Sequence, residues 1–174
     1  MANDSLSALH ILLSGLSSPD ITERTSIIRR LIENFELPHL YKLLVATLED
    51  EDSSIAFFAA RVLALMFPLH SVSHLTKLLM APDSDLRHST CLILGDLGTS
   101  VASSKLLEVA QNDEDPDVRF TAISVLKSCG EVDCIPVLNA IAKKDNAKTI
   151  DGRAISREAA DVAAFLNQKF TSRT

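Results

Sequence analysis

The residues in this sequence that are best suited to chemistry are histidines and cysteines. His70 and His74 are four residues apart, so one helix face would carry both imidazoles, a spacing compatible with two metal ligands. No third ligand is evident and no His-Glu-x-x-His motif occurs, which favours solvated or capping histidines. Cys91, Cys129 and Cys134 are odd in number and form no Cys-x-x-Cys pair, which predicts reduced thiols.

One acidic run that could suggest a calcium site comprises Asp113, Glu114, Asp115 and Asp117. It lacks the loop glycine and the closing glutamate of an EF-hand, so we interpret it as a turn and helix cap. Glycine-rich phosphate-binding motifs and the Gly-x-Ser-x-Gly motif are also absent. We therefore predict no catalytic residue, no bound metal and no cofactor. Enzymatic activity stays open but is less favoured than binding.

The composition indicates a helical globular protein. The sequence has 174 residues, of which 47% are hydrophobic and 23% are charged, and it contains only 5 glycines and 6 prolines. The net charge of −6 disfavours nucleic acid as a partner, because such binding depends on clustered Lys and Arg. No apolar run approaches the roughly 20 residues of a membrane span, and no basic leader precedes the first apolar residues. We expect a soluble, cytoplasmic protein without membrane insertion.

A repeat of 31 or 32 residues runs through the chain. Aligning the repeats places Arg24, Ala56, Arg87 and Arg119 at equivalent positions. Apolar residues follow these positions at helical spacing in each repeat. Acidic or small polar residues suited to N-caps precede each segment. The repeated segments are 21–35, 53–67, 84–98 and 116–130.

A second helix fits between each pair of repeated segments, so each repeat is a helical hairpin. One hairpin cannot bury its apolar stripe alone, which favours stacking of neighbours into one domain over residues 1–174. A closing helix at about 155–169 has one apolar and one charged face and suits a cap. The predicted hairpins are about 5–35, 38–67, 71–98, 101–130 and 134–169, with the intervening helices at about 38–48, 71–80, 101–111 and 134–144.

Two of the repeated segments have the most distinctive sequences: DEDPDVRFTAISVLKSCG (113–130) and, more loosely, PDSDLRHSTCLILGDLG (82–98). They resemble the acidic turn, Val-Arg, Ala and Leu-x-x-Leu-Gly pattern of the HEAT-repeat family, and most closely the HEAT-like repeats associated with phycobilisome lyases. The similarity extends over nearly the whole chain, although Glu23 replaces the usual Val and Ala56 the usual Arg. The resemblance implies an all-α, right-handed α-solenoid of about five HEAT-like helical hairpins. It also implies a structural ladder between repeats, formed by Arg87, Arg119, Asp85 and Asp117.

A row of residues on the repeated helices should point away from the core, because a residue two places after a core position lies about 200° around the helix. The resemblance to HEAT repeats implies that this row lines the concave side of the stack. Aromatic and Arg side chains there would suit partner binding. In the alternative, Phe57 and Phe120 pack into grooves between repeats and the arginines only solvate the surface. The proposed partner-binding ridge comprises Arg29, Phe57, Arg61, His88, Leu92 and Phe120.

The largest break in the repeat is NAKTIDGRAIS (146–156), where Asp151-Gly152 indicates a turn. We expect Arg153 to contact Asp145 or a helix end. A structural role for this loop is favoured over binding, which stays open. Cys91 and Cys129 occupy repeat positions that are expected to be apolar and buried. Cys134 is expected to be more exposed than these two thiols.

These patterns favour a non-catalytic interaction or scaffold module that binds a protein partner on its concave helix face. The alternative is a bilin lyase-like enzyme, or a lyase subunit, acting on phycobiliproteins, as the family resemblance implies. The sequence leaves the partner and the oligomeric state open.

Overall fold

The structure is a computed structural model that describes residues 2–172, without the side chains of residues 2–4 and 21, so both ends of the predicted domain lie outside it. It divides into two compact units, one up to Leu75 and one from Thr76. Every regular element of the described chain is helical, except for an isolated bridge between Lys148 and Ala154.

The first unit contains four α-helices among its described residues, and a fifth begins there. A short 3-10 turn, Gly15–Ser17, links the first two. α5 spans Pro68–Leu78, so it begins in the first unit and ends in the second. The four helices are α1 (Ala2–Ser14), α2 (Ile21–Asn34), α3 (Leu37–Thr47) and α4 (Ser53–Met66).

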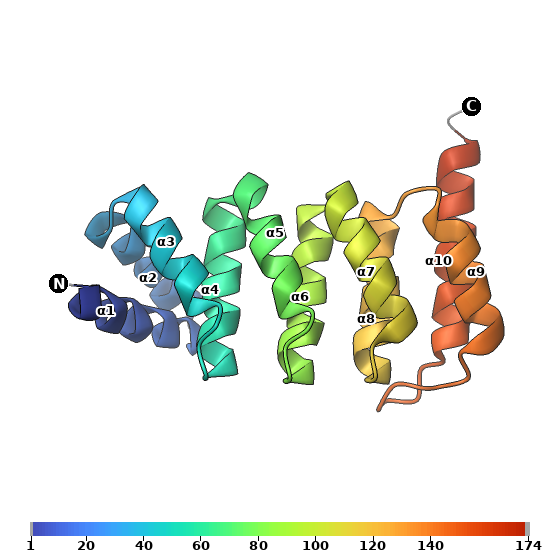
Figure 1. Cartoon of the computed structure of the whole chain (residues 1–174), viewed down its shortest axis with the longest axis horizontal. Coiled ribbons are helices and arrows are strands. Elements are labelled where there is room, and N and C mark those ends of the chain that lie inside the picture. Colours follow the sequence, from blue (N-terminus) through green and yellow to red (C-terminus); the bar gives the residue numbers. More distant parts are fainter. Residues whose placement is uncertain (1, 173–174) are drawn as a thin grey trace. The chain divides into compact units, whose positions relative to one another are not determined.

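The second unit continues the alternation of helices. Figure 1 shows α7 and α9 in one layer and α6, α8 and α10 in the other. The charged helix predicted at 155–169 corresponds to α10 and packs on both α8 and α9. The helices are α6 (Ser84–Leu97), α7 (Ser100–Asn112), α8 (Pro116–Cys129), α9 (Cys134–Lys144) and α10 (Ile155–Thr171).

Four aspartates begin the even-numbered helices at the period of the sequence repeat. Asp20, Asp52, Asp83 and Asp115 are the N-caps of α2, α4, α6 and α8. Each side chain accepts a hydrogen bond of 2.8 Å from the backbone N–H two residues later. Such a cap stabilises a helix by about 1 kcal/mol, so the acidic turns fix where these helices start.

The core lies between the two layers of each unit. Leu31 and Leu63 in the first unit, and Leu94 and Leu126 in the second, occupy one column of the repeat and are fully buried. In the second unit α6 and α8 approach closely at Gly95, where an added Cβ would lie 2.6 Å from Cβ of Val125. A side chain at this position would push the two helices apart.

The structure and the sequence agree on the fold class. The chain is all-α and built as an α-solenoid of paired helices, with the repeated segments forming α2, α4, α6 and α8. That the two units form a single domain stays a prediction. Within residues 2–172, no helix combines the length and apolar character that crossing a bilayer requires.

Candidate functional site

An arginine–aspartate pair links successive hairpins of the second unit. Arg87, on α6, is only 5% exposed. Its Nε and a terminal nitrogen donate to the two carboxylate oxygens of Asp113, both at 2.9 Å, and another terminal nitrogen donates to the carbonyls of Ala81 and Pro82. The hydrogen bond to Asp113 raises the pKa of Arg87 above its usual value, although burial opposes this. The buried guanidinium is therefore fully satisfied.

The same arrangement recurs one repeat later. Arg119 Nε donates to Asp145 at 2.9 Å, and its terminal nitrogen donates to the carbonyl of Asp113 at 2.8 Å. Both pairs join residues 26 apart in the sequence. Burial alone would raise the pKa of Asp145, but hydrogen bonds from Arg119 and from the backbone N–H of Ala147 hold it below the usual value. Each arginine therefore holds the turn of the next hairpin.

The partners of these arginines differ from the predicted ladder, which named Asp85 and Asp117. Both residues lie in the first turn of the helix that carries the arginine, whereas the guanidinium extends to the turn before the next helix. Asp117 instead accepts a hydrogen bond of 3.0 Å from the backbone N–H of Ile150, and Asp85 is exposed. Asp113 and Asp145 are the residues that sequence reasoning missed. Their separation of 32 residues, one repeat, was the available signal.

In the first unit, the ridge residues lie on α2 and α4. Arg29 is exposed, and Phe57 is half-buried. The guanidinium carbon of Arg61 lies 5.5 Å from the centre of the Phe57 ring, in a cation–π arrangement, and Phe58 packs at 5.1 Å on that ring. The exposed Arg61 and the partly exposed ring therefore form one amphipathic patch.

In the second unit, only part of the ridge is accessible. His88 is half-buried and Leu92 is 45% exposed, one turn further along α6. Phe120, on α8, is only 8% exposed, because the guanidinium of Arg153 lies over its ring at 4.2 Å. Phe120 is therefore packed inside the protein, as in the alternative to an exposed ridge. Leu92, in contrast, presents an apolar side chain to solvent.

The loop between α9 and α10 holds Arg153 over Phe120. Thr149 is buried and exchanges hydrogen bonds with Arg153, while Asp151 accepts one from Thr149 and another from the Arg153 guanidinium. Gly152 has a φ of +85°, which L side chains rarely adopt, so glycine is required at this turn. Arg153 was expected to contact Asp145 or a helix end and instead contacts Asp151 and Phe120.

Of the two histidines four residues apart, His70 is exposed and His74 packs against Tyr41, while the three thiols are buried. His74 Nε2 lies 3.0 Å from the Tyr41 hydroxyl. Burial raises the pKa of the Cys91 thiol to about 12 and that of Cys129 to about 11. The prediction that Cys134 is the more exposed thiol was wrong, because it is 1% exposed beside Ser103. No trio of His, Cys, Asp or Glu placed to hold a metal ion occurs among the described residues.

We name the solvent-facing side of the even-numbered helices the even-helix face: α2 and α4 in the first unit, and α6, α8 and α10 in the second. In each unit this face is carried by stacked hairpins with regular caps, and in the second unit the arginine–aspartate pairs also hold the turns. Such an arrangement defines the class of helical-repeat proteins.

The chain is similar to known helical-repeat sequences and structures. Residues 72–157 match the family of HEAT repeats. A crystal structure of an engineered protein, a target of the Northeast Structural Genomics Consortium, is also similar, with 18% sequence identity and a TM-score of 0.53. That similarity covers 95% of this chain and 80% of the engineered one, and at such identity it shows the fold alone. No curated protein matches the sequence.

Proposed function

We propose that the protein is a non-catalytic interaction module that binds a protein partner on its even-helix face. The observation that carries this proposal is that large side chains on this face remain accessible although the packed helices beneath them are rigidly capped. Leu92 is 45% exposed, and Arg61 covers the half-buried Phe57 from the solvent side. Aromatic, aliphatic and Arg side chains on a pre-organised surface are the usual anchors of protein interfaces.

The chemistry of the buried groups supports binding over thiol catalysis. A nucleophilic cysteine needs a lowered pKa and access to a substrate, whereas burial raises the pKa values of Cys91 and Cys129. The similarity of residues 72–157 to HEAT repeats also supports a scaffold, although repeat folds host many activities. The partner-binding role therefore rests on Leu92, Phe57 and Arg61 rather than on Phe120.

The test is quantitative affinity capture from native lysate with variants that change accessible residues only. Arg61→Glu reverses a charge in the first unit, and Leu92→Asp places a charge on the exposed apolar position in the second. Phe120→Asp is unsuitable, because it would bury a charge in the core. We expect at least one of the two variants to lose a specific partner that the wild-type protein retains.

Matched controls place the same changes on the other layer. Lys42→Glu on α3 is the counterpart of Arg61→Glu, and Leu37→Asp, also on α3 and 50% exposed, is the counterpart of Leu92→Asp. Equal loss in the controls, or an unchanged set of partners in the variants, would contradict the proposal. Transfer of a bilin to an apo-phycobiliprotein by the purified protein would instead support the lyase-like alternative.

A further inference from the structure

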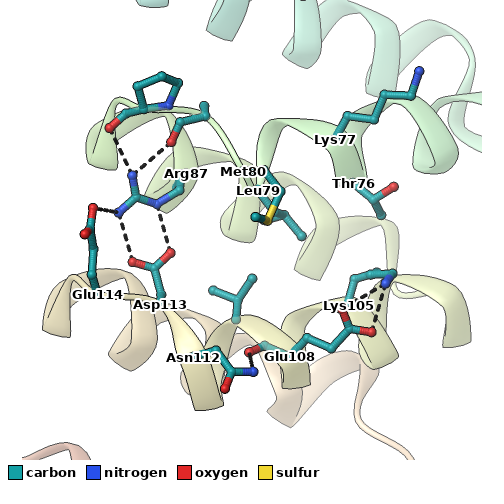
Figure 2. A pocket seen from close by; sticks show the side chains of 13 residues that line it. Thr76, Lys77, Leu79, Met80, Arg87, Lys105, Glu108, Asn112, Asp113 and Glu114 are labelled. Carbon is teal, nitrogen blue, oxygen red and sulfur yellow. Dashed lines mark hydrogen bonds and ion pairs between the residues drawn. The ribbon is translucent and has the colours of Figure 1, made fainter.

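A groove crosses the second unit between the turn that follows α5 and the neighbouring side of α7 (Figure 2). It encloses about 660 Å³, and its lining residues all lie between Thr76 and Glu114. This volume falls in the range of roughly 300–1,000 Å³ that is usual for binding pockets. The groove belongs to the layer of α7, so it is distinct from the even-helix face.

The centre of the groove is apolar. Leu79 and Val109 form its floor and are nearly buried. Met80 stands beside them and is 84% exposed, although it is flanked by apolar residues. A flexible, polarizable methionine above an apolar floor adapts to the side chains of a partner. An apolar side chain seated here would cover Met80 and remove both surfaces from water.

The two ends of the groove carry opposite charges (Figure 2). Lys77 and Lys105 lie at one end. Lys105 is paired with Glu108 at 2.8 Å, whereas Lys77 has no ion-pair partner among residues 2–172. A cation at this end is therefore available to an anionic partner group.

At the acidic end, too, one charged side chain is engaged within the protein and another is accessible to a partner. Asp113 is engaged by Arg87, as described above, and its side chain is only 5% exposed. Glu114 is 88% exposed and touches the same guanidinium only at 3.6 Å. Glu114 is therefore the carboxylate that a partner reaches, and the groove presents a lysine, an apolar centre and a glutamate in that order.

We infer that this groove binds an amphipathic segment of a partner protein, with apolar side chains on Met80 and Leu79, an acidic side chain at Lys77 and a basic side chain at Glu114. The apolar centre supplies affinity through burial, and the opposed charges set the direction in which the segment lies. The order of charges in the groove therefore specifies the order of charges in the ligand.

The test uses a displayed library of short random peptides selected on the whole protein. We expect the selected peptides to carry an acidic residue, an apolar centre and a basic residue in constant order. Met80→Asp should weaken their binding by about tenfold or more. The double variant Lys77→Glu/Glu114→Lys should select the reversed order of charges. Val132→Asp, at a 60% exposed position between α8 and α9 that lies outside both the groove and the even-helix face, is the matched control and should leave peptide affinity unchanged.

A local readout separates this groove from other binding surfaces. The sequence contains three methionines, so methyl-labelled methionine gives few NMR signals, and the Met80 methyl resonance should shift in a saturable way as peptide is added. Selected peptides that lack the charge pattern, or that bind without shifting Met80, would overturn the inference. A concentration-dependent shift of Met80 without peptide would also overturn it, because the groove would then take a second copy of this chain.

Discussion

Arg87 reaches Asp113 through two hydrogen bonds of 2.9 Å across 26 residues of sequence, and Arg119 reaches Asp145 across the same interval. In the first unit the corresponding pair is not formed. Arg24 donates to the carbonyl of Ser18, while Asp50 pairs with His10 Nε2 at 2.9 Å. The regular pairs therefore belong to the second unit, which also contains most of the match to HEAT repeats.

Removing one member of the buried pair should destabilise the protein strongly. Arg87→Met keeps much of the apolar stem but leaves Asp113, whose side chain is 5% exposed, without its counter-ion. A buried charge left in this way costs about 3 kcal/mol of unfolding free energy, measured by urea denaturation. Arg119→Met should cost less, because its pair is more exposed. If the exposed control Arg157→Met cost as much as Arg87→Met, the structural role of this pair would be wrong.

The unfolding free energy should decrease in acid partly because Asp145 becomes protonated. Its pKa is lowered in the folded state, so its contribution is present above the unfolded value of about 3.9 and is lost as pH falls through the lower folded value. Asp145→Asn should lower stability near neutral pH and flatten its dependence on pH below about 4. Asp161→Asn, at an exposed position of α10, should leave the profile unchanged. Identical profiles for wild type and Asp145→Asn would contradict this assignment.

The thiols should be unreactive until the protein unfolds. Burial raises the pKa of Cys91 to about 12 and that of Cys129 to about 11, and Cys134 is buried as well. At mildly alkaline pH, a disulfide reagent should modify the native protein slowly and the urea-unfolded protein at once. The raised pKa values also predict that stability declines as pH rises above about 8.5, where the unfolded thiols ionise. Rapid modification of one thiol in the native state would show that it is accessible.

Phe120 and Arg153 should have very different effects on stability. Phe120→Ala removes a buried ring and should cost about 3–5 kcal/mol. Arg153→Ala removes a cation–π contact and an exposed ion pair with Asp151. Exposed ion pairs contribute little, so we expect a loss of about 0.5–1 kcal/mol, mainly from the cation–π contact. Phe165→Ala, on the exposed side of α10, is the control for the loss of a ring. If Phe120→Ala lost as little unfolding free energy as Phe165→Ala, Phe120 would be exposed, as the predicted partner-binding ridge requires.

The helices could be predicted from the sequence because their signals are local. An aspartate at the start and apolar residues at helical spacing determine where α6 and α8 begin and which side they bury. The partners of Arg87 and Arg119 depend on where the next turn lies in space, which residue spacing alone does not specify. The burial of Phe120 depends on a loop conformation set by Thr149, Asp151 and Gly152, and no periodic pattern describes it.

The central claim is that the even-helix face contacts a protein partner. It is tested most directly by placing a photo-crosslinking amino acid at Leu92 on α6 and, in a separate protein, at Leu37 on α3, and then irradiating each in native lysate. We predict a discrete crosslinked product from position 92 and none from position 37, because Leu37 is similarly exposed but lies outside both the even-helix face and the groove beside α7. The same product from both positions, or a product from position 37 alone, would contradict the claim.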